Sequence, residues 1–464
     1  MITLEETAIN STITGLPTLL SDIRVQLAAM TQQETLSSDS AGLLMMVGRL
    51  LTMLEADQQR PAAQTIASGA ALLQRFDVRA TGDDETAIEN ALAALVSERR
   101  DADTRRAVID RYLADAGGIQ QQRAGVAASD QREAVVSAGD PAQRFAAYLS
   151  QKAGRTIGPL KKFQRIAGGY SKLSIAVELE AKDDFGWGTQ LIVRMDFADG
   201  ATDFSVADEY PLLQRLHGSA VPVAKPYAAE TDRRILGEPF LVSALLPGIS
   251  ARSGDPTVAA WGDKVALRRE LGLQLARALG ALHAVTPPEA AGLEARAQLR
   301  RYLGEWRQRW QKLNAPPSPA LTLAFDWLEE NLPREIARLA YIHGDFAPYN
   351  ALQHQGHLTA VIDWEFVHLG DPAEDVGYCR KYMEALLPWD EFLATYVTAG
   401  GPAYRSDSAA FYEVWCHVRN AVVLLQSRQV YVSGRNRDIK ALYAGAEFHD
   451  YFLMQALALI REQL

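Results

Sequence analysis

The sequence predicts an α+β protein with an all-α helical N-terminal domain, followed by a small lobe that mixes strands and helices and a large, mostly helical lobe. Three observations lead to this prediction. Apolar residues recur at helical spacing in the first 115 residues, alternation with a period of two begins near residue 166, and helical periodicity returns after residue 248. At 464 residues, the chain is also longer than one hydrophobic core usually serves.

The N-terminal helical domain is expected over residues 1–115. It contains no histidine or cysteine, so we expect it to dock on the rest of the chain or to mediate oligomerisation, and not to catalyse. Residues 116–139 are rich in Gly, Gln, Ala and Ser, which is typical of a linker or a partly frayed helix. Two apolar stripes support the helices: Leu43, Leu44, Val47, Leu50, Leu51 and Leu54, then Ile88, Leu92, Leu95 and Val96.

The small lobe is expected over residues 140–248 and the large lobe over residues 249–464. Asp140 and Pro141 supply a helix cap and a proline for the first helical turn. Alternating apolar residues then predict a β-hairpin, and the helical pattern after residue 248 predicts the second lobe.

The residues between 341 and 375 carry the pattern with the most chemical content. Asp345 precedes Asn350 by five positions, and Asp363 follows a short apolar segment. Phosphoryl transfer uses this order of groups, because one carboxylate orients the attacking hydroxyl while an amide and a second carboxylate hold magnesium. We therefore expect Asp345 to be the catalytic base and Asn350 and Asp363 to ligate Mg2+. His343 is expected to brace the loop through hydrogen bonds.

Other polar residues near this pattern have structural interpretations or are left open. Glu365 either joins a second metal ion or has a structural role. Asp371 and Asp375 are interpreted as loop and helix caps, because an Asp-Pro pair precedes a helical segment. His283 ends an apolar helical stripe and is interpreted as a packed structural histidine.

A cation and a carboxylate in the small lobe have the order of a phosphate-orienting pair. Arg194 lies at the end of a strand predicted over residues 189–195, and Glu209 lies at the start of a predicted helix. In kinase-like proteins a strand-borne cation pairs with a helix-borne glutamate and points at the nucleotide phosphates. Kinases use lysine at this position, and the alternative is a surface arginine at a strand end.

Two further segments are expected to contact ATP. A Gly168-Gly169 turn with Ser171 precedes the strand predicted from residue 173. This turn either lays backbone N–H groups over the phosphates or is an ordinary turn. The outgoing strand that ends at Gly248 is expected to hold adenine through backbone amides and apolar side chains. Its candidate residues are Ser243, Ala244, Leu245 and Leu246.

Charge and composition exclude several classes of function. The formal net charge of -10 argues against nucleic-acid binding, which needs a basic surface. No segment approaches the roughly 18 consecutive apolar residues of a membrane span, and the N-terminus does not resemble a signal peptide, so we expect a cytoplasmic protein. Cys379 and Cys416 lack metal-site spacing and are expected to be buried free thiols.

One basic stretch stands out in this acidic chain. Residues 296–312 carry six basic groups and one glutamate, with aromatic residues at four-residue steps. The stretch is either a surface that receives an anionic part of the substrate or a solvated helix face packed by aromatics. The candidate substrate-binding residues are Arg300, Arg301, Trp306 and Arg309.

Residues from about 140 to 460 resemble the aminoglycoside phosphotransferase and choline kinase superfamily. The resemblance rests on His343-Gly-Asp345, Asn350 and Ile362-Asp-Trp-Glu365, with Asp375 after Gly370-Asp-Pro372. Within it, Phe240–Gly248, Arg300–Trp306 and Phe411–Arg419 are most similar to the kinase-like domains associated with acyl-CoA dehydrogenases. The resemblance implies a bilobal protein-kinase-like fold that uses ATP and Mg2+.

The expected function is phosphorylation of a hydroxyl group on a small molecule. The resemblance implies a hydroxyacyl-CoA as the acceptor, and the basic stretch favours it, because CoA phosphates would be attracted where a polycation would be repelled. Phosphorylation of an aminoglycoside or macrolide is the alternative, with acids such as Asp390, Glu391 and Glu413 forming the pocket. A nucleotide-binding pseudokinase scaffold is the third possibility.

Overall fold

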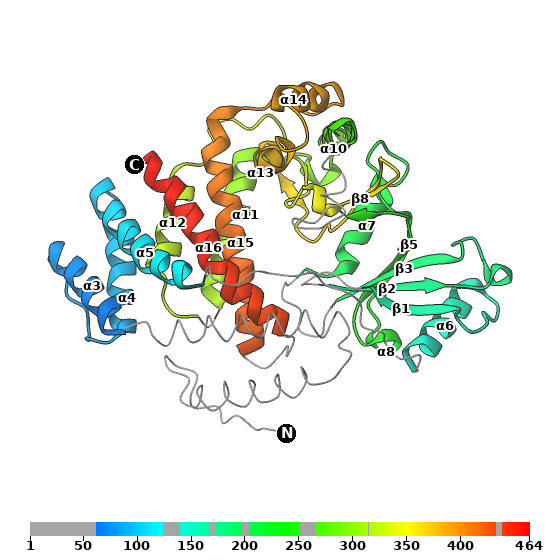
Figure 1. Ribbon diagram of the computed structural model, residues 1–464, viewed down its shortest axis with the longest axis horizontal. Helices are drawn as coiled ribbons and strands as arrows, with labels where there is room; N and C mark the ends of the chain where they lie inside the picture. Colours follow the sequence, from blue (N-terminus) through cyan, green and yellow to red (C-terminus); the bar gives the residue numbers. More distant parts are fainter. Residues whose placement is uncertain are drawn as a thin grey trace.

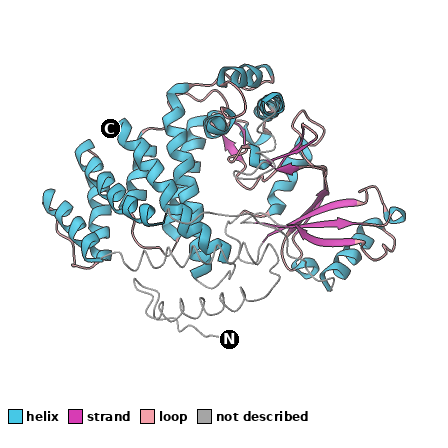
Figure 2. Cartoon of the chain, viewed as in Figure 1, coloured by secondary structure: helices cyan, strands magenta, loops and turns pink. Residues whose placement is uncertain are grey.

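The computed structural model describes residues 62–123, 140–166, 172–196, 204–250, 265–313, 315–432 and 439–464. Within these ranges a five-stranded sheet with its helices lies at one end of the molecule, and a larger helical assembly lies at the other (Figure 1). Figure 2 shows the same separation by secondary-structure type, with the long strands of the five-stranded sheet in the smaller part and short strands among the helices of the larger one. The predicted α+β architecture is therefore confirmed. None of the described helices is both long and apolar enough to cross a bilayer.

The smaller lobe is built on an antiparallel sheet with strand order β1-β2-β3-β5-β4. The hairpin predicted from alternation is β2 with β3. The elements of this lobe are α6 Asp140–Ala153, β1 Lys162–Ile166, β2 Lys172–Glu178, η1 Ala181–Asp183, β3 Gln190–Asp196, α7 Val206–Leu216, β4 Pro226–Glu230, α8 Arg233–Leu236 and β5 Phe240–Ala244.

The alternation of β3 decides which of its side chains can serve a site. Leu191 and Val193 are fully buried and pack in one core with Phe145 of α6. Because side chains on a strand alternate between the two faces, Arg194 points to the face opposite this core. The apolar pattern of the strand therefore presents a cation to the large lobe.

The large lobe consists of helices with two small sheets between them. β7 pairs with β10, and β8 lies between β6 and β9. Its elements are β6 Ile249–Ser250, α10 Val265–Ala284, η2 Pro288–Ala290, α11 Ala295–Lys312, α12 Pro319–Glu330, β7 Ala340–Ile342, η3 Pro348–Asn350, β8 Ala351–His354, β9 His357–Val361, β10 His368–Gly370, α13 Ala373–Met383, α14 Trp389–Thr398, η4 Ser406–Ser408, α15 Ala409–Val432 and α16 Ile439–Gln463.

The N-terminal helices share a hydrophobic core with the large lobe. They are α3 Ala62–Arg75, α4 Glu85–Glu98 and α5 Ala102–Arg123. Leu92 of α4 and Phe325 of α12 belong to one buried cluster. Arg105 of α5 also pairs with Glu330 of α12 at 2.7 Å. The helices are thus held to the large lobe by both apolar packing and ion pairs.

Two expectations for the N-terminal part are not confirmed. The apolar stripe from Leu43 to Leu54 lies outside the described residues. The segment predicted to begin a linker at residue 116 continues as helix to Arg123, so the linker prediction is wrong for residues 116–123. The alternative of a helix was correct there, because the Gln-rich run after Gly117 and Gly118 has good helix propensity.

A substitution at Leu92 tests whether the shared core unites these parts. Leu92 is fully buried, so Leu92→Ala is expected to lower the free energy of unfolding by about 2–5 kcal/mol. Because the cluster continues into α12, we expect one unfolding transition that moves as a whole in a urea titration followed by circular dichroism. Asn90→Ala, at an exposed position of the same helix, is the control. Two separate transitions, with only one shifted, would show that the N-terminal helices fold on their own.

Candidate active site

Arg194 joins the small lobe to the large lobe through two carboxylates. Its Nη1 donates to Oε2 of Glu209 on α7 at 2.7 Å, and its Nη2 donates to Oδ1 of Asp363 at 2.8 Å. The rigid guanidinium fork suits this double role, because its two nitrogens can meet two separate carboxylates. The expected Arg194–Glu209 ion pair is therefore present. Asp363 also binds Arg194, and we call these three residues the Arg194 triad.

Burial sets the electrostatics of this triad. Only 3% of the Glu209 side chain is exposed, compared with 32% of Asp363. Burial raises the pKa of Glu209 to about 7, although the Arg194 cation acts in the opposite direction. The two carboxylates raise the pKa of Arg194 despite its burial, so the arginine is always charged. The triad is a fixed cation held between a buried acid and an accessible one.

Asp363 has a backbone conformation that is uncommon for a residue other than glycine. Its φ angle is 68°, in the left-handed region that Asp tolerates better than most residues. Trp364, only 1% exposed, anchors the turn by donating its indole N–H to the carbonyl of Val361. Ile362 donates its backbone N–H to the carbonyl of Asn350 at 2.9 Å, which places the two candidate metal ligands on neighbouring backbone segments.

His343 braces the loop that carries Asp345. The backbone N–H of Asp345 donates to Nδ1 of His343 at 3.2 Å, so Nδ1 is an acceptor. Nε2 of His343 lies 3.0 Å from the carbonyl oxygen of Ile362 and therefore carries the hydrogen. The ring joins the Asp345 loop to the segment before Asp363, in the bracing position that the sequence predicts.

Asp375 has a different position from the one expected. It lies inside the first turn of α13, where its carboxylate accepts the backbone N–H groups of His343 at 2.7 Å and Gly344 at 2.8 Å. His283 contacts the same carboxylate at 3.1 Å and the hydroxyl of Tyr396 at 2.7 Å. The helix-cap interpretation of Asp375 is therefore wrong, whereas His283 is a buried structural histidine as predicted.

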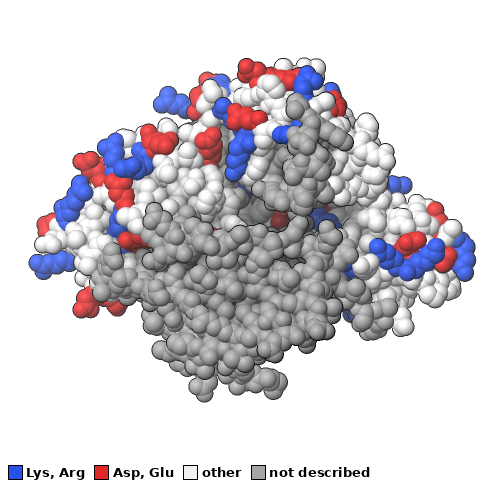
Figure 3. All heavy atoms as spheres, viewed as in Figure 1, with Lys and Arg blue, Asp and Glu red and all other residues white. Residues whose placement is uncertain are grey.

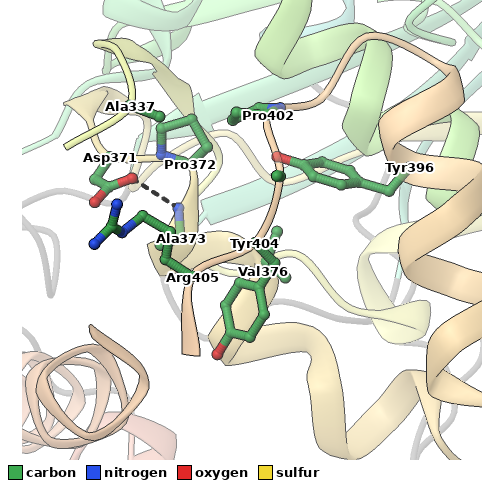
Figure 4. A pocket seen from close by; sticks show the side chains of 10 residues that line it. Ala337, Asp371, Pro372, Ala373, Val376, Tyr396, Pro402, Tyr404 and Arg405 are labelled. Atoms are coloured by element: carbon green, nitrogen blue, oxygen red, sulfur yellow. Dashed lines mark hydrogen bonds between the residues drawn. The ribbon is translucent and has the colours of Figure 1, made fainter. Parts of the chain in front are cut away.

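Asp371, not Asp375, serves the start of α13. Its Oδ1 accepts the backbone N–H of Ala373 at 3.0 Å, and its Oδ2 accepts the hydroxyl of Tyr412 at 2.9 Å. Figure 4 shows the bond to Ala373 at the edge of a small pocket. The pocket is lined by Ala337, Asp371, Pro372, Ala373, Val376, Tyr396, Pro402, Ala403, Tyr404 and Arg405. The lining does not include the Asp345 loop.

A buried arginine that the sequence analysis did not identify supports the same loop. Arg419 of α15 is fully buried, pairs with Glu374 at 2.9 Å and donates to the carbonyl of Gly344. Glu374 also contacts His368 at 3.2 Å, and the His368 ring stacks on Tyr302 of α11 with centroids 3.9 Å apart. The loop is thus tied to α13, α15 and α11.

The Asp345 carboxylate is held on both of its oxygens. Asn350 donates Nδ2 to Oδ2 at 2.8 Å and to the backbone carbonyl of the same aspartate at 2.9 Å. Tyr349 donates its hydroxyl to Oδ1 at 2.6 Å, and Tyr378 donates its hydroxyl to the same oxygen. Burial raises the pKa of Asp345, and these hydroxyl donors act in the opposite direction. Neither tyrosine is among the site residues predicted from the sequence.

The basic helix α11 is divided between core and surface. Trp306, 2% exposed, packs in the core against Trp415 and does not offer its ring to a ligand. The substrate-contact expectation for Trp306 is therefore replaced by packing. Arg309 stacks on Phe204 of the small lobe at 4.5 Å, while Arg300 and Arg301 are exposed.

The segments expected to contact ATP are described only in part. Gly168, Gly169 and Ser171 lie outside the described residues. Ala244 and Leu245 donate their backbone N–H groups to the carbonyls of Lys225 and Gln190 at 2.9 and 3.0 Å, so these donors are used within the lobe. Ser243 is 5% exposed, and Leu246 follows at the point where the chain leaves the sheet.

The acids proposed for a polycation pocket lie on two helices of the large lobe, α14 and α15. Glu391 of α14 pairs with Arg269 of α10. Glu413, on α15, is half-buried, and burial raises its pKa while Arg380 acts in the opposite direction. On the face shown in Figure 3, acidic and basic side chains are interspersed over the described surface. Glu391 and Glu413 therefore each have a basic neighbour.

Comparison with known proteins identifies relatives of the chain. A family model described as "Phosphotransferase enzyme family" matches residues 162–410, which is more than half of the chain. Acyl-CoA dehydrogenase family member 10 of Mus musculus is 28% identical over 185 residues, covering 38% of this chain and 17% of that protein. Acyl-CoA dehydrogenase family member 11 of Gallus gallus is 26% identical over 180 residues, covering 38% of this chain and 22% of that protein. The matched region is thus less than a quarter of these relatives' length.

A solved structure shows the same fold. A Ralstonia eutropha protein assigned as an aminoglycoside phosphotransferase is similar with a TM-score of 0.52 and 21% sequence identity. The match covers 69% of this chain and 98% of that one. The predicted bilobal, protein-kinase-like fold is therefore confirmed.

Proposed function

Because the chain belongs to the phosphotransferase enzyme family, we propose that it transfers the γ-phosphoryl group of ATP to a hydroxyl group of a small molecule. The Arg194 triad is the observation that carries this proposal. One guanidinium bridges Glu209 of the small lobe and Asp363 of the large lobe, at 2.7 and 2.8 Å. A cation fixed in this way between two lobes is suited to hold the phosphates of a nucleotide.

Asp345 is proposed to receive the acceptor hydroxyl. The acceptor oxygen forms a bond to the γ-phosphorus, and the bond from that phosphorus to the β–γ bridging oxygen breaks, with its electron pair leaving on ADP. The proton of the acceptor passes to the Asp345 carboxylate. His343, Asp375 and Arg419 hold the loop, so Asp345 is already positioned before the substrate binds.

Asn350 and Asp363 fit a magnesium ion. The nitrogen of the Asn350 side chain is engaged by Asp345, so its amide oxygen is the atom that a metal would meet. Asp363 adds a partly exposed carboxylate, and oxygen ligands of these two kinds are those that Mg2+ prefers. Within the described residues, no group of three or more His, Cys, Asp or Glu could hold a metal ion. Bound Mg2+ would neutralise charge on the β- and γ-phosphates.

The proposed nucleotide contacts combine Arg194 with the two segments predicted from the sequence. Gly168, Gly169 and Ser171 are proposed to cover the phosphates. Leu246 is proposed to offer its backbone to the adenine edge, since the donors of Ala244 and Leu245 are already used.

The proposed acceptor is a hydroxyacyl-CoA. The similarity to acyl-CoA dehydrogenase family members supports this choice, as do Arg300, Arg301 and Arg309 on α11. The basic neighbours of Glu391 and Glu413 disfavour a polycationic aminoglycoside, because a pocket for such a ligand needs uncompensated negative charge. The contacts of Asp345 with Asn350 and of Asp363 with Arg194 disfavour a pseudokinase scaffold, because the groups needed for phosphoryl transfer are present.

A substrate panel tests this proposal. Purified protein with ATP and Mg2+ is expected to release ADP with hydroxyacyl-CoAs, and mass spectrometry should detect the phosphorylated thioester. Choline, a macrolide and an aminoglycoside serve as competing acceptors. ADP release with the aminoglycoside alone would overturn the choice of acceptor. ATP binding without transfer to any acceptor would favour the pseudokinase.

A further inference from the structure

We propose that Tyr349 and Tyr378 are positioning residues that keep water away from Asp345 and so direct the phosphoryl group to the acceptor hydroxyl. The proposal rests on the phosphotransferase function proposed above. It concerns a problem that every kinase faces, because water is also a nucleophile and is present at far higher concentration than any acceptor.

The two phenols occupy one oxygen of the Asp345 carboxylate. Both hydroxyls donate to Oδ1, and the two phenol oxygens lie 2.6 Å apart. A carboxylate oxygen accepts about two hydrogen bonds, so Oδ1 has no remaining position for water. Asn350 takes one position on Oδ2, at 2.8 Å. One position on Oδ2 is left, and the acceptor hydroxyl is proposed to bind there.

The phenols come from separate elements that meet only in the folded protein. Tyr349 lies in η3 and Tyr378 lies in α13, and both are half-buried. Tyr382 packs edge-on against Tyr349 with centroids 5.4 Å apart and lies 6.0 Å from Tyr378. The guanidinium of Arg419 lies 5.9 Å from the centre of the Tyr378 ring. These contacts hold the two hydroxyls over Oδ1.

Removal of the hydroxyls would leave a small polar space beside Oδ1. A carboxylate oxygen with open acceptor positions is a favourable place for water. Such a water could attack the γ-phosphorus. Its oxygen would bond to phosphorus, the bond to the bridging oxygen would break toward ADP, and one proton would pass to Asp345. The products are inorganic phosphate and ADP, with no phosphorylated acceptor.

The test compares Tyr349→Phe, Tyr378→Phe and the double variant with the wild-type protein. We expect the double variant to form ADP without acceptor roughly tenfold faster, on the scale of one hydrogen bond to a charged group. With acceptor, kcat for transfer is expected to fall roughly tenfold while KM for ATP stays unchanged. The ratio of phosphorylated product to ADP should therefore fall, which a loss of folded protein would not produce.

Tyr382→Phe is the matched control, because it removes a hydroxyl from a tyrosine whose ring packs against the pair. It is expected to keep the wild-type product-to-ADP ratio. The proposal would be overturned if the double variant kept the wild-type product-to-ADP ratio and the wild-type rate of ADP formation without acceptor. It would also be overturned if Tyr382→Phe lowered the ratio and raised that rate as much as the double variant does. Equilibrium binding of an ATP analogue separates a failure of the proposed phosphotransferase function from a failure of the proposed role of the tyrosines. A wild-type protein that binds no ATP overturns the phosphotransferase function, whereas binding with unchanged coupling in the double variant overturns only the role of the tyrosines.

Discussion

Asp345→Asn is expected to lower kcat for phosphoryl transfer by about 10³-fold, within the range that positioned acid–base groups supply. Asparagine keeps the size of the side chain but cannot take the proton of the acceptor hydroxyl. Asn350 and Asp363 remain, so nucleotide affinity is expected to stay near that of the wild-type protein. Single-turnover kinetics and isothermal titration with a non-hydrolysable ATP analogue measure the two quantities.

Asp407→Asn is the control for this prediction. It makes the same change at an exposed carboxylate of the large lobe, which pairs with Arg405 at 2.7 Å on the surface. The control should retain wild-type kcat and affinity. If Asp345→Asn also retained wild-type kcat, the assignment of Asp345 as the base would be wrong.

The local motifs of the site could be read from the sequence because their parts are close along the chain. Asp345 and Asn350 share one loop, and spacing alone places them together, as the 2.8 Å contact between their side chains shows. Alternation on β3 similarly predicts a strand that carries Arg194 near its end. Its partner Glu209 is only 15 residues away, and their ion pair is present.

The supports of the site could not be predicted, because they come from distant parts of the chain. Arg419 reaches the carbonyl of Gly344 across 75 positions, and His283 meets Asp375 across 92. Arg419 ends the Phe411–Arg419 segment of the resemblance, but its sequence neighbours do not show which distant carbonyl it contacts. Tyr378 is likewise brought to Asp345 only by the packing of α13, so a side-chain pattern in one segment cannot reveal the contact.

Helical periodicity also leaves open which neighbour a helix packs against. The stripe that includes Leu92 predicts a buried face, and the structure buries it against the large lobe. In α11 the four-residue spacing of aromatic residues likewise does not show whether they pack in the core or face a ligand. In the structure Trp306 is buried in the core, while Arg309 stacks on Phe204.

Arg194→Met is expected to lower the free energy of unfolding by about 3–5 kcal/mol, because it leaves a buried carboxylate without its cation. Glu209 has only 3% of its side chain exposed, so water cannot replace the guanidinium. Asp363, at 32%, can be solvated and contributes less to the loss. Affinity for ATP is also expected to fall, since the variant lacks the proposed phosphate contact. Urea denaturation and titration with an ATP analogue measure these effects.

The stability loss of Arg194→Met should depend on pH in a direction set by Glu209. Burial raises the folded-state pKa of Glu209 above its ordinary value of 4.5, and removal of Arg194 raises it further. A carboxyl group whose pKa is higher in the folded than in the unfolded state stabilises the folded protein at pH values below its unfolded-state pKa. This contribution is lost as the pH rises through the folded-state pKa. The loss should therefore be smaller at pH 5 than at pH 8. Glu209→Gln added to Arg194→Met should restore the free energy of unfolding at pH 8. The buried ion pair would be contradicted by equal stability losses at pH 5 and pH 8, together with strictly additive effects of the two substitutions.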